Sequence, residues 1–430
     1  MKRFAQLSLH TFLAQAGGLA CGLASGVVIA RAMGPTAKGA IAVYTLIAGF
    51  LALVGNLGLG LANVHLVARN EYPARTAWAN SLWVAAAAGS LLAAAAFFLA
   101  PLAGIALRRP LDMGLLVISL VSVPWLLWFD YQSNLLRGLQ RIGWFNAANL
   151  LRQAGRLALL AILVVGLRGG TAGALWSANV ALAAAGLACW LLIRSTGNAG
   201  LAPSWHRLKA ASAYGLKGQA GQLIQFFNYR LDMILLALFW SNREVGIYTT
   251  AVFAAELVWY IPSAVATVLL PKISAVTEPA QGADRSARAI RHTLLWSLAA
   301  AAVLAALAKP LITGLYGPSF APAVPALWVL LAGVAALAPG KVIVSHLAAI
   351  GKSQYVSYMA LAGLGLTLAL DLLLIPRYGI IGAAAASALA YGGSGLACLY
   401  WMKRETGLGI RSSLVPRRDD WQDYRELMPL

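Results

Sequence analysis

Four cations within apolar stretches are the residues of this sequence best suited to chemistry: Arg152, Arg156, Arg230 and Lys341. An arginine or lysine at the centre of a membrane-spanning helix costs about 2.5–3.5 kcal/mol, so each charge needs a ligand or an acidic partner. Arg152 and Arg156 are one turn apart and share a helical face. Guanidinium donors suit the oxygens of a pyrophosphate. The four residues are therefore candidates for an anion site that lines a cavity.

Acidic residues in the same stretches offer a competing interpretation, which is internal pairing. The matching acids are Asp130, Asp232, Glu256 and Asp371. Asp130 lies at a depth similar to that of Arg152, and Asp232 follows Arg230 closely in sequence. Asp232 and Glu256 are also candidates for carrying a coupling ion, H⁺ or Na⁺.

A polar stripe runs along the apolar stretch 214–239. Gln222, Gln225, Tyr229 and Asp232 recur at steps of three and four residues, so they share one helical face. This face must meet water or polar partners rather than lipid. Its amides suit sugar hydroxyls, although hydrogen bonding between helices explains them equally well. The candidate sugar ligands are Gln219, Gln222, Gln225, Asn228, Asn56 and Asn63.

The composition places these residues in a membrane. The chain has 430 residues, of which 60% are hydrophobic and 11% are charged, about half the charge of a soluble domain. Apolar runs longer than about 18 residues recur, which predicts an all-α polytopic membrane protein. The net charge of +19 is assigned to loops that orient the chain, not to nucleic acid. No metal-ligand or nucleophile motif is present, so we expect no cofactor, no metal and no enzymatic activity.

Hydropathy predicts about twelve transmembrane helices. A linker at 196–213 separates an N-terminal lobe, 1–195, from a C-terminal lobe, 214–402, and a tail follows at 403–430. The predicted spans are 8–31, 41–66, 78–101, 113–136, 145–166, 172–194, 214–239, 246–270, 292–315, 323–348, 355–375 and 380–402.

The distribution of lysine and arginine predicts the orientation. With a cytoplasmic N-terminus, 21 of these residues fall in inside segments and 8 in outside segments, so both termini are expected in the cytoplasm. No outside loop is long. This disfavours a membrane glycan polymerase or ligase, which needs an outside loop to hold its chemistry.

An internal repeat sets the expected architecture. Gly39 and Gly246, each opening a span, are 207 residues apart, and Gly170 and Gly379 are 209 apart. The spacing predicts two six-helix lobes related by an axis along the membrane normal, with a cavity between them.

Several longer motifs carry a family resemblance. They are Ala30–Gly39, Arg230–Asp232 with Glu244–Ala251, Leu270–Ile273, Leu315–Leu327, Gly351–Tyr355 and Leu374–Ala383. Together they resemble the Wzx-type polysaccharide flippases of the multidrug/oligosaccharidyl-lipid/polysaccharide (MOP) superfamily, which share a MATE-like fold. The chain departs from the family pattern at Ile41, where an aromatic is usual, and at Thr367 and Asp371, where the family often has asparagine.

The resemblance implies a flippase of the bacterial cytoplasmic (inner) membrane. Its substrate would be an undecaprenyl-pyrophosphate-linked oligosaccharide, such as an O-antigen or exopolysaccharide repeat. The expected partners are this glycan, membrane lipids, H⁺ or Na⁺, and polysaccharide-assembly proteins docking on Arg417, Arg418 and Trp421 of the tail. Anionic lipid near the tail is the alternative explanation of these cations.

A cation-coupled multidrug antiporter of the same fold is the main alternative function. Such an antiporter would need an acidic residue deep in the first span. That span offers only Gln15 and Ser25 as interior polar groups, which disfavours the antiporter.

Overall fold

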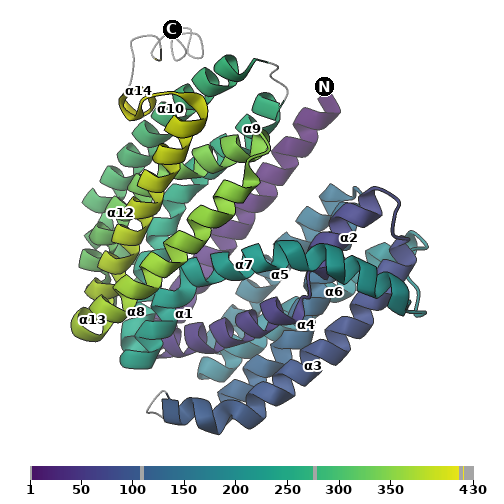
Figure 1. The fold of residues 1–430 in the computed structure, drawn as a ribbon. Coiled ribbons are helices and arrows are strands. Elements are labelled where there is room, and N and C mark those ends of the chain that lie inside the picture. The colour runs from purple at the N-terminus through teal and green to yellow at the C-terminus, as the bar shows by residue number, and fades with distance from the viewer. Residues whose placement is uncertain (1, 107–110, 275–277, 416–419, 421–430) are drawn as a thin grey trace. The chain divides into compact units, whose positions relative to one another are not determined.

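The structure is a computed structural model that describes residues 2–106, 111–274, 278–415 and 420. Every regular element in these ranges is a helix (Figure 1). Contacts divide the chain into two units, 1–223 and 224–430, and the boundary falls within α7. The predicted linker 196–213 therefore groups with the first unit, as do residues 214–223 of the predicted C-terminal lobe.

The first unit contains the helices from α1 to the N-terminal part of α7. Their bounds are α1 Lys2–Gly55, α2 Leu59–Ala68, α3 Ala74–Ala106, α4 Met113–Gly138, α5 Ile142–Leu160 with a π-helical turn at Ala161–Gly166, α6 Gly170–Ser195 and α7 Trp205–Phe239.

The second unit contains the rest of α7 and seven further α-helices. Their bounds are α8 Asn242–Glu256, a 3₁₀ turn at Leu257–Trp259, α9 Tyr260–Ser274, α10 Pro279–Ala306, α11 Ala308–Tyr316, a 3₁₀ turn at Pro318–Phe320, α12 Ala323–Ala349, α13 Ser353–Thr406 and α14 Ile410–Leu414.

Many of the helices are long and apolar enough to cross a membrane. In the described residues, nine helical segments are long and apolar enough to cross a bilayer. Two of them, α1 and α13, have 54 residues each, about twice what one crossing needs. Each is broken, so each provides two crossings. Helix α7 is not among the nine segments, so the crossing predicted at 214–239 stays a prediction. The predicted polytopic all-α architecture is confirmed.

The breaks in α1 and α13 occur at glycines with left-handed backbone. Gly34 has φ 74° and precedes Pro35, while Gly379 has φ 54°. Left-handed residues also recur at a spacing of about 210 in three pairs: Gln140 and Gly351, Gly170 and Gly379, and Gly197 and Gly407. The backbone therefore repeats the duplication that the sequence predicts.

The second predicted span, 41–66, is not one helix. The helix ends at Gly55, and α2 begins at Leu59 after a turn in which Leu57 and Gly58 have positive φ. The Asn56 side chain accepts a hydrogen bond from the Gly60 amide at 3.3 Å and so caps α2. The expectation of a continuous span was wrong because apolar residues continue through a turn that only backbone geometry reveals.

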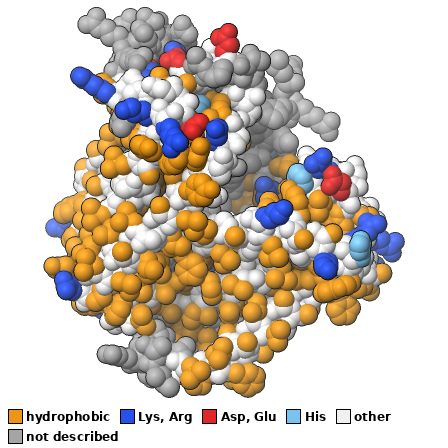
Figure 2. Space-filling view, in the orientation of Figure 1, with side chains coloured by type: hydrophobic (Ala, Val, Ile, Leu, Met, Phe, Trp, Pro, Cys, Tyr) orange, Lys and Arg blue, Asp and Glu red, His pale blue; other side chains and the backbone are white. Residues whose placement is uncertain are grey.

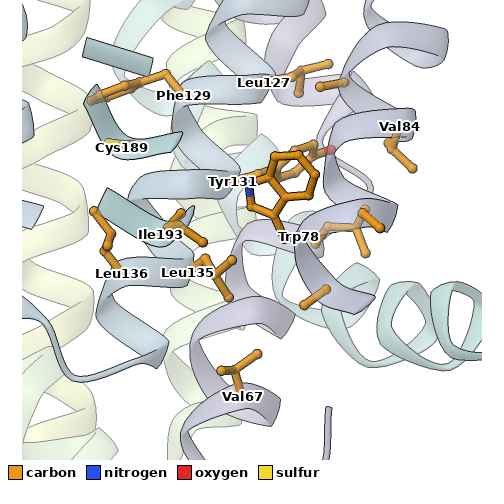
Figure 3. Packing of buried hydrophobic residues seen from close by; sticks show 14 of the residues in the cluster. Val67, Trp78, Val84, Leu127, Phe129, Tyr131, Leu135, Leu136, Cys189 and Ile193 are labelled. Atoms are coloured by element: carbon orange, nitrogen blue, oxygen red, sulfur yellow. The ribbon is translucent and has the colours of Figure 1, made fainter. Parts of the chain in front are cut away.

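A cluster of buried hydrophobic residues in the first unit lies where α2, α3, α4 and α6 meet (Figure 3). Trp78 and Tyr131 fill the centre of this cluster. The Tyr131 hydroxyl donates to the Gly55 and Asn56 carbonyls at the helix break, at 3.2 and 2.9 Å, and the Asn56 carbonyl also accepts from the Leu59 amide. Tyr131 thus both packs in the hydrophobic cluster and hydrogen-bonds to the backbone at the α1–α2 break.

The surface is apolar over the helices and basic at their ends. In Figure 2 hydrophobic side chains cover most of the visible face, and lysine and arginine gather toward its edges. Large side chains such as Leu91, Phe98 and Leu396 are exposed. Water would disfavour such a surface, whereas lipid does not.

The C-terminal tail is tied to the second unit by a buried ion pair. The Arg291 guanidinium donates to both Asp420 carboxylate oxygens, at 2.6 and 2.7 Å, and to the Ser412 carbonyl at 2.8 Å. The Arg291 and Asp420 side chains are only 3% and 4% exposed. The tail residues predicted to dock a partner, Arg417, Arg418 and Trp421, lie outside the described residues.

We predict that Asp420→Ala destabilises the protein by about 3 kcal/mol, because it leaves a buried arginine without its counter-charge. Thermal unfolding in detergent measures the effect. The control is Asp284→Ala, which removes an exposed pair with Arg288 at 3.8 Å and should lower the melting temperature little. Equal shifts in the two variants would contradict the prediction.

Candidate functional site

Arg152 and Arg156 lie on the side of α5 away from its exposed apolar residues. Leu151 and Ile162, 46% and 55% exposed, mark that apolar side. The Nε atoms of both arginines are buried without a hydrogen-bond partner. In the described part of the chain neither guanidinium forms an ion pair. Two cations one turn apart are therefore left uncompensated.

The acid expected to neutralise them is occupied elsewhere. The Asp130 carboxylate accepts from the Asn56 amide at 2.8 Å and from the Asn134 side chain. The contact recorded for Arg152 is instead with Phe129, whose ring centroid lies 5.4 Å from the guanidinium carbon. An aromatic face stabilises a cation without removing its charge, so Arg152 keeps donors for an anion.

Lys341 is held by aromatic rings. Its ammonium lies 4.4 Å from the ring centroid of Trp259 and 5.7 Å from that of Tyr229. It stands two residues after Pro339, which is inside α12. These rings stabilise the Lys341 ammonium without neutralising its charge, and they restrict the positions that the side chain can adopt.

Arg230 pairs with Glu256, not with the nearby Asp232. The Arg230 Nη1 and Glu256 Oε1 atoms are 3.0 Å apart, and the two side chains are 33% and 27% exposed. Residues two apart on a helix point in different directions, which is why the neighbour in sequence is not the partner. Two predicted roles, anion binding at Arg230 and ion coupling at Glu256, thus meet in one pair.

Asp232 sits in a buried hydrogen-bond network. Its carboxylate accepts from the hydroxyls of Tyr248 at 2.6 Å and Ser387 at 3.1 Å, and from the Met233 amide at 2.7 Å. These donors come from α7, α8 and α13. The network fixes one acidic group deep in the second unit.

Asp371 is a second buried acid, and both its carboxylate oxygens lack a hydrogen-bond partner in the described part of the chain. Its side chain is fully buried, and Asp232 acts on it electrostatically. Two nearby carboxyl groups cannot both ionise unless a cation or a proton offsets the charge. The sequence marked Asp371 as a pairing acid only; its lack of a partner is visible in the structure alone.

The predicted amide stripe divides into bonded and exposed members. Gln219 donates to the Leu53 carbonyl, and Asn228 donates to the Ala360 carbonyl at 3.0 Å. Gln222 and Gln225 are exposed. These last two are the members with amides placed to meet a solute.

The two asparagines predicted with the stripe are also hydrogen-bonded. Asn56 binds Asp130, and Asn63 donates to the Ser81 hydroxyl at 2.8 Å. The Asn63 side-chain oxygen is buried and unpartnered. A sugar role for either asparagine stays a prediction.

The N-terminal part of α7 is fixed against the α1–α2 break. A Cβ atom added to Gly215 would lie 2.0 Å from the Gly58 carbonyl oxygen, so the two backbones touch. The Tyr214 ring stacks on His65 with centroids 4.9 Å apart. Upstream of α7, Asn80 binds the backbone of Ser204 through both its amide atoms, at 2.8 and 3.0 Å. These contacts position the first turns of the polar stripe.

Sequence comparison finds two family models that match overlapping parts of the chain. The model of the polysaccharide biosynthesis protein family matches residues 9–277. The model of the lipid II flippase MurJ matches residues 205–415. No protein of curated function matches the chain by sequence.

Solved structures resemble the fold along most of its length. The lipid II flippase MurJ in an inward closed conformation has a TM-score of 0.78 at 17% identity, covering 93% of this chain and 87% of that chain. An inward-facing multidrug resistance MATE family transporter of the MOP superfamily has 0.72 at 16%, covering 91% and 94%. A MOP superfamily transporter from Pyrococcus furiosus has 0.64 at 16%, covering 94% and 95%. The predicted MOP resemblance is confirmed.

We predict that Gly215→Ala impairs both stability and transport, because the added methyl group forces the α7 backbone away from Gly58. Gly221→Ala is the matched control on the same helix, since nothing lies within 4 Å of its added Cβ; alanine there should be neutral or slightly stabilising. Thermal unfolding and a transport assay should separate the variants. Similar behaviour of the two would show that the contact is dispensable.

Proposed function

Because this chain belongs to the polysaccharide biosynthesis protein family, we propose that it is a flippase for undecaprenyl-pyrophosphate-linked oligosaccharides. It moves an O-antigen or exopolysaccharide unit from the inner to the outer leaflet of the bacterial cytoplasmic membrane by alternating access. The observation that carries the proposal is the pair Arg152 and Arg156, two cations in a membrane-spanning helix without an acidic partner among the described residues.

A pyrophosphate would supply the missing counter-charge. Unpaired cations at membrane depth are costly, and an anion that arrives with the substrate removes this cost. Forked guanidinium donors match phosphate oxygens in pairs. The exposed amides of Gln222 and Gln225 are available for sugar hydroxyls. Lys341 and Arg230 take supporting roles, since rings hold the first and Glu256 offsets the second.

Ion coupling is assigned to the acids of the second unit. Asp232 and the unpartnered Asp371 could bind H⁺ or Na⁺, because their mutual repulsion favours a bound cation. The membrane potential would assist the outward movement of a negative headgroup by about 2.3 kcal/mol per charge per 100 mV. Glu256 contributes indirectly, through its pair with Arg230.

A cation-coupled multidrug antiporter is the second candidate function. It is favoured by the buried acid pair and by the fold shared with MATE family transporters. The unpaired arginines argue against it, since they would repel a cationic drug. A glycan polymerase or ligase has no supporting feature in the described residues, and transport without catalysis accounts for the site.

The remaining assignments follow from the proposed function. Both termini lie in the cytoplasm, as the lysine and arginine bias indicates. The partners are the lipid-linked glycan, membrane lipids and the enzymes of polysaccharide assembly, and no nucleic acid is involved.

The first test is transbilayer movement in proteoliposomes. Wild-type protein should bring an undecaprenyl-pyrophosphate oligosaccharide within reach of an external glycosidase, and Arg156→Gln should slow this at least tenfold, because one charge-assisted phosphate contact is lost. Arg69→Gln, which breaks an exposed pair with Glu71, should move substrate at the wild-type rate. Efflux of a cationic dye in place of glycan movement would support the antiporter.

The second test addresses coupling. Asp371→Asn removes the unpartnered acid and should make glycan movement insensitive to an imposed H⁺ or Na⁺ gradient, because the cation no longer has a charged ligand. Asp112→Asn is the control, since Asp112 caps α4 through the Leu115 amide and asparagine caps equally well. A gradient response in Asp371→Asn equal to that of wild type would exclude Asp371 from coupling.

A further inference from the structure

Three exposed arginines at one end of the first unit each rest on an aromatic ring. The guanidinium carbon of Arg137 lies 5.3 Å from the ring centroid of Phe145. Arg141 over Trp144 and Arg194 over Trp190 show the same distance. They stand in the last turn of α4, at the start of α5 and in the last turn of α6. The ring covers one face of each guanidinium and leaves its N–H edges free.

Of the three arginines, only Arg137 rests on a ring that shares a helical face with Arg152 and Arg156. Phe145 and Arg152 are seven residues apart on α5, so they lie on the same face, about 10 Å apart along the axis. Arg156 follows about 6 Å further on the same side. Trp144 has the same seven-residue relation to Leu151, which is exposed on the apolar side. Arg141 therefore lies off this face, and Arg194 rests on a ring of its own helix, α6, rather than on a ring of α5.

Rings and cations alternate along the face. Arg137 of α4 rests on Phe145 of α5, and Arg152 of α5 rests on Phe129 of α4. The two helices thus exchange cation–π contacts at two depths. A headgroup that leaves the first guanidinium meets the second, and then Arg156, without crossing an apolar gap longer than about two helical turns.

Arg137 keeps its charge available for a ligand. Its Nη1 donates to the Asn134 side chain at 3.2 Å, and it has no ion pair among the described residues. Asp130 attracts Arg137 from earlier on α4, but its carboxylate already accepts from Asn56 and Asn134. Asn134 thus stands between the cation and the acid, and the outer edge of the guanidinium stays exposed.

We propose that Arg137, held on Phe145, is the entrance site at which the pyrophosphate of the lipid-linked substrate first binds before it passes along α5 to Arg152 and Arg156. This inference rests on the proposed function, because the same headgroup must bind at all three positions. Arg137 acts on capture of the substrate and not on its later movement. Its loss is therefore compensated by a high substrate concentration, whereas loss of Arg156 is not.

The experiment measures binding of undecaprenyl pyrophosphate, without a glycan, to full-length protein in nanodiscs of zwitterionic phosphatidylcholine. Arg137→Gln should slow association and raise Kd about tenfold, the effect of one charge-assisted contact. Its affinity should also fall less steeply with salt than that of wild type. Phe145→Leu keeps the charge and removes the ring, and should raise Kd about threefold. Arg141→Gln and Arg194→Gln, which break the same kind of stacked contact, should change Kd less than twofold.

The outcomes separate this inference from the proposed function. Equal losses in all three arginine variants would replace the entrance site by general surface attraction, as for an anionic lipid headgroup, and would overturn the proposal. If Arg137→Gln binds undecaprenyl pyrophosphate normally while Arg156→Gln binds it weakly, the entrance site is overturned, but the proposed flippase function is not. If the wild-type protein does not bind undecaprenyl pyrophosphate, both the entrance site and the proposed function are overturned. Thermal unfolding of each variant confirms that the protein compared is folded.

Discussion

The cost of a charge away from water is the constraint on which the rest of this structure depends. In the second unit Glu256 offsets Arg230, hydroxyls and an amide hold Asp232, and aromatic rings enclose Lys341, whereas the Asp371 carboxylate has no hydrogen-bond partner among the described residues. The first unit does not offset this cost at Arg152 and Arg156, whose Nε atoms have no partner in the part of the chain that the structure describes. A charge left without a partner inside a membrane is costly to stability, so these two arginines point to a ligand. The headgroup of a lipid-linked glycan has the charge and the geometry to be that ligand.

The same constraint governs the breaks in the helices. A break frees backbone carbonyls, which need donors inside a membrane. At the α1–α2 break the Tyr131 and Gln219 side chains of other helices donate to these carbonyls, beside the Asn56 and Leu59 amides of the break itself. Gly215 lets α7 approach closely enough for the Gln219 bond. The polar stripe of α7 therefore has two uses. Its buried Gln219 donates to a carbonyl at the break, and its exposed Gln222 and Gln225 present their amides.

The architecture could be predicted from the sequence because hydropathy and repeat spacing are local signals. The breaks near Gly34 and Gly379 were visible in composition and recur in the backbone. The break at Asn56 was hidden, because apolar residues continue through it. Arg230 lies close to Asp232 in sequence, yet positions two apart on a helix point in different directions, and Arg230 pairs with Glu256 instead. The isolation of Asp371 could not be foreseen at all, since a missing partner is a property of the whole packing and not of any segment.

The duplication explains why the two kinds of site lie in different halves. Ser25 stands 207 residues before Asp232 in the repeat, and its hydroxyl donates to its own helix at the Cys21 carbonyl, so the first half has no acid there. Positions 361–363, which correspond to Arg152 at the repeat spacing of about 210, are leucine, alanine and glycine. The unpartnered arginines thus belong to the first half and the unpartnered aspartate to the second, although Asp130 lies in the first half and Arg230 and Lys341 lie in the second. Under the proposed function, the arginines would bind the anionic cargo and the aspartate would bind the coupling cation. An arginine and an aspartate paired with each other would neutralise each other and leave neither available for a ligand.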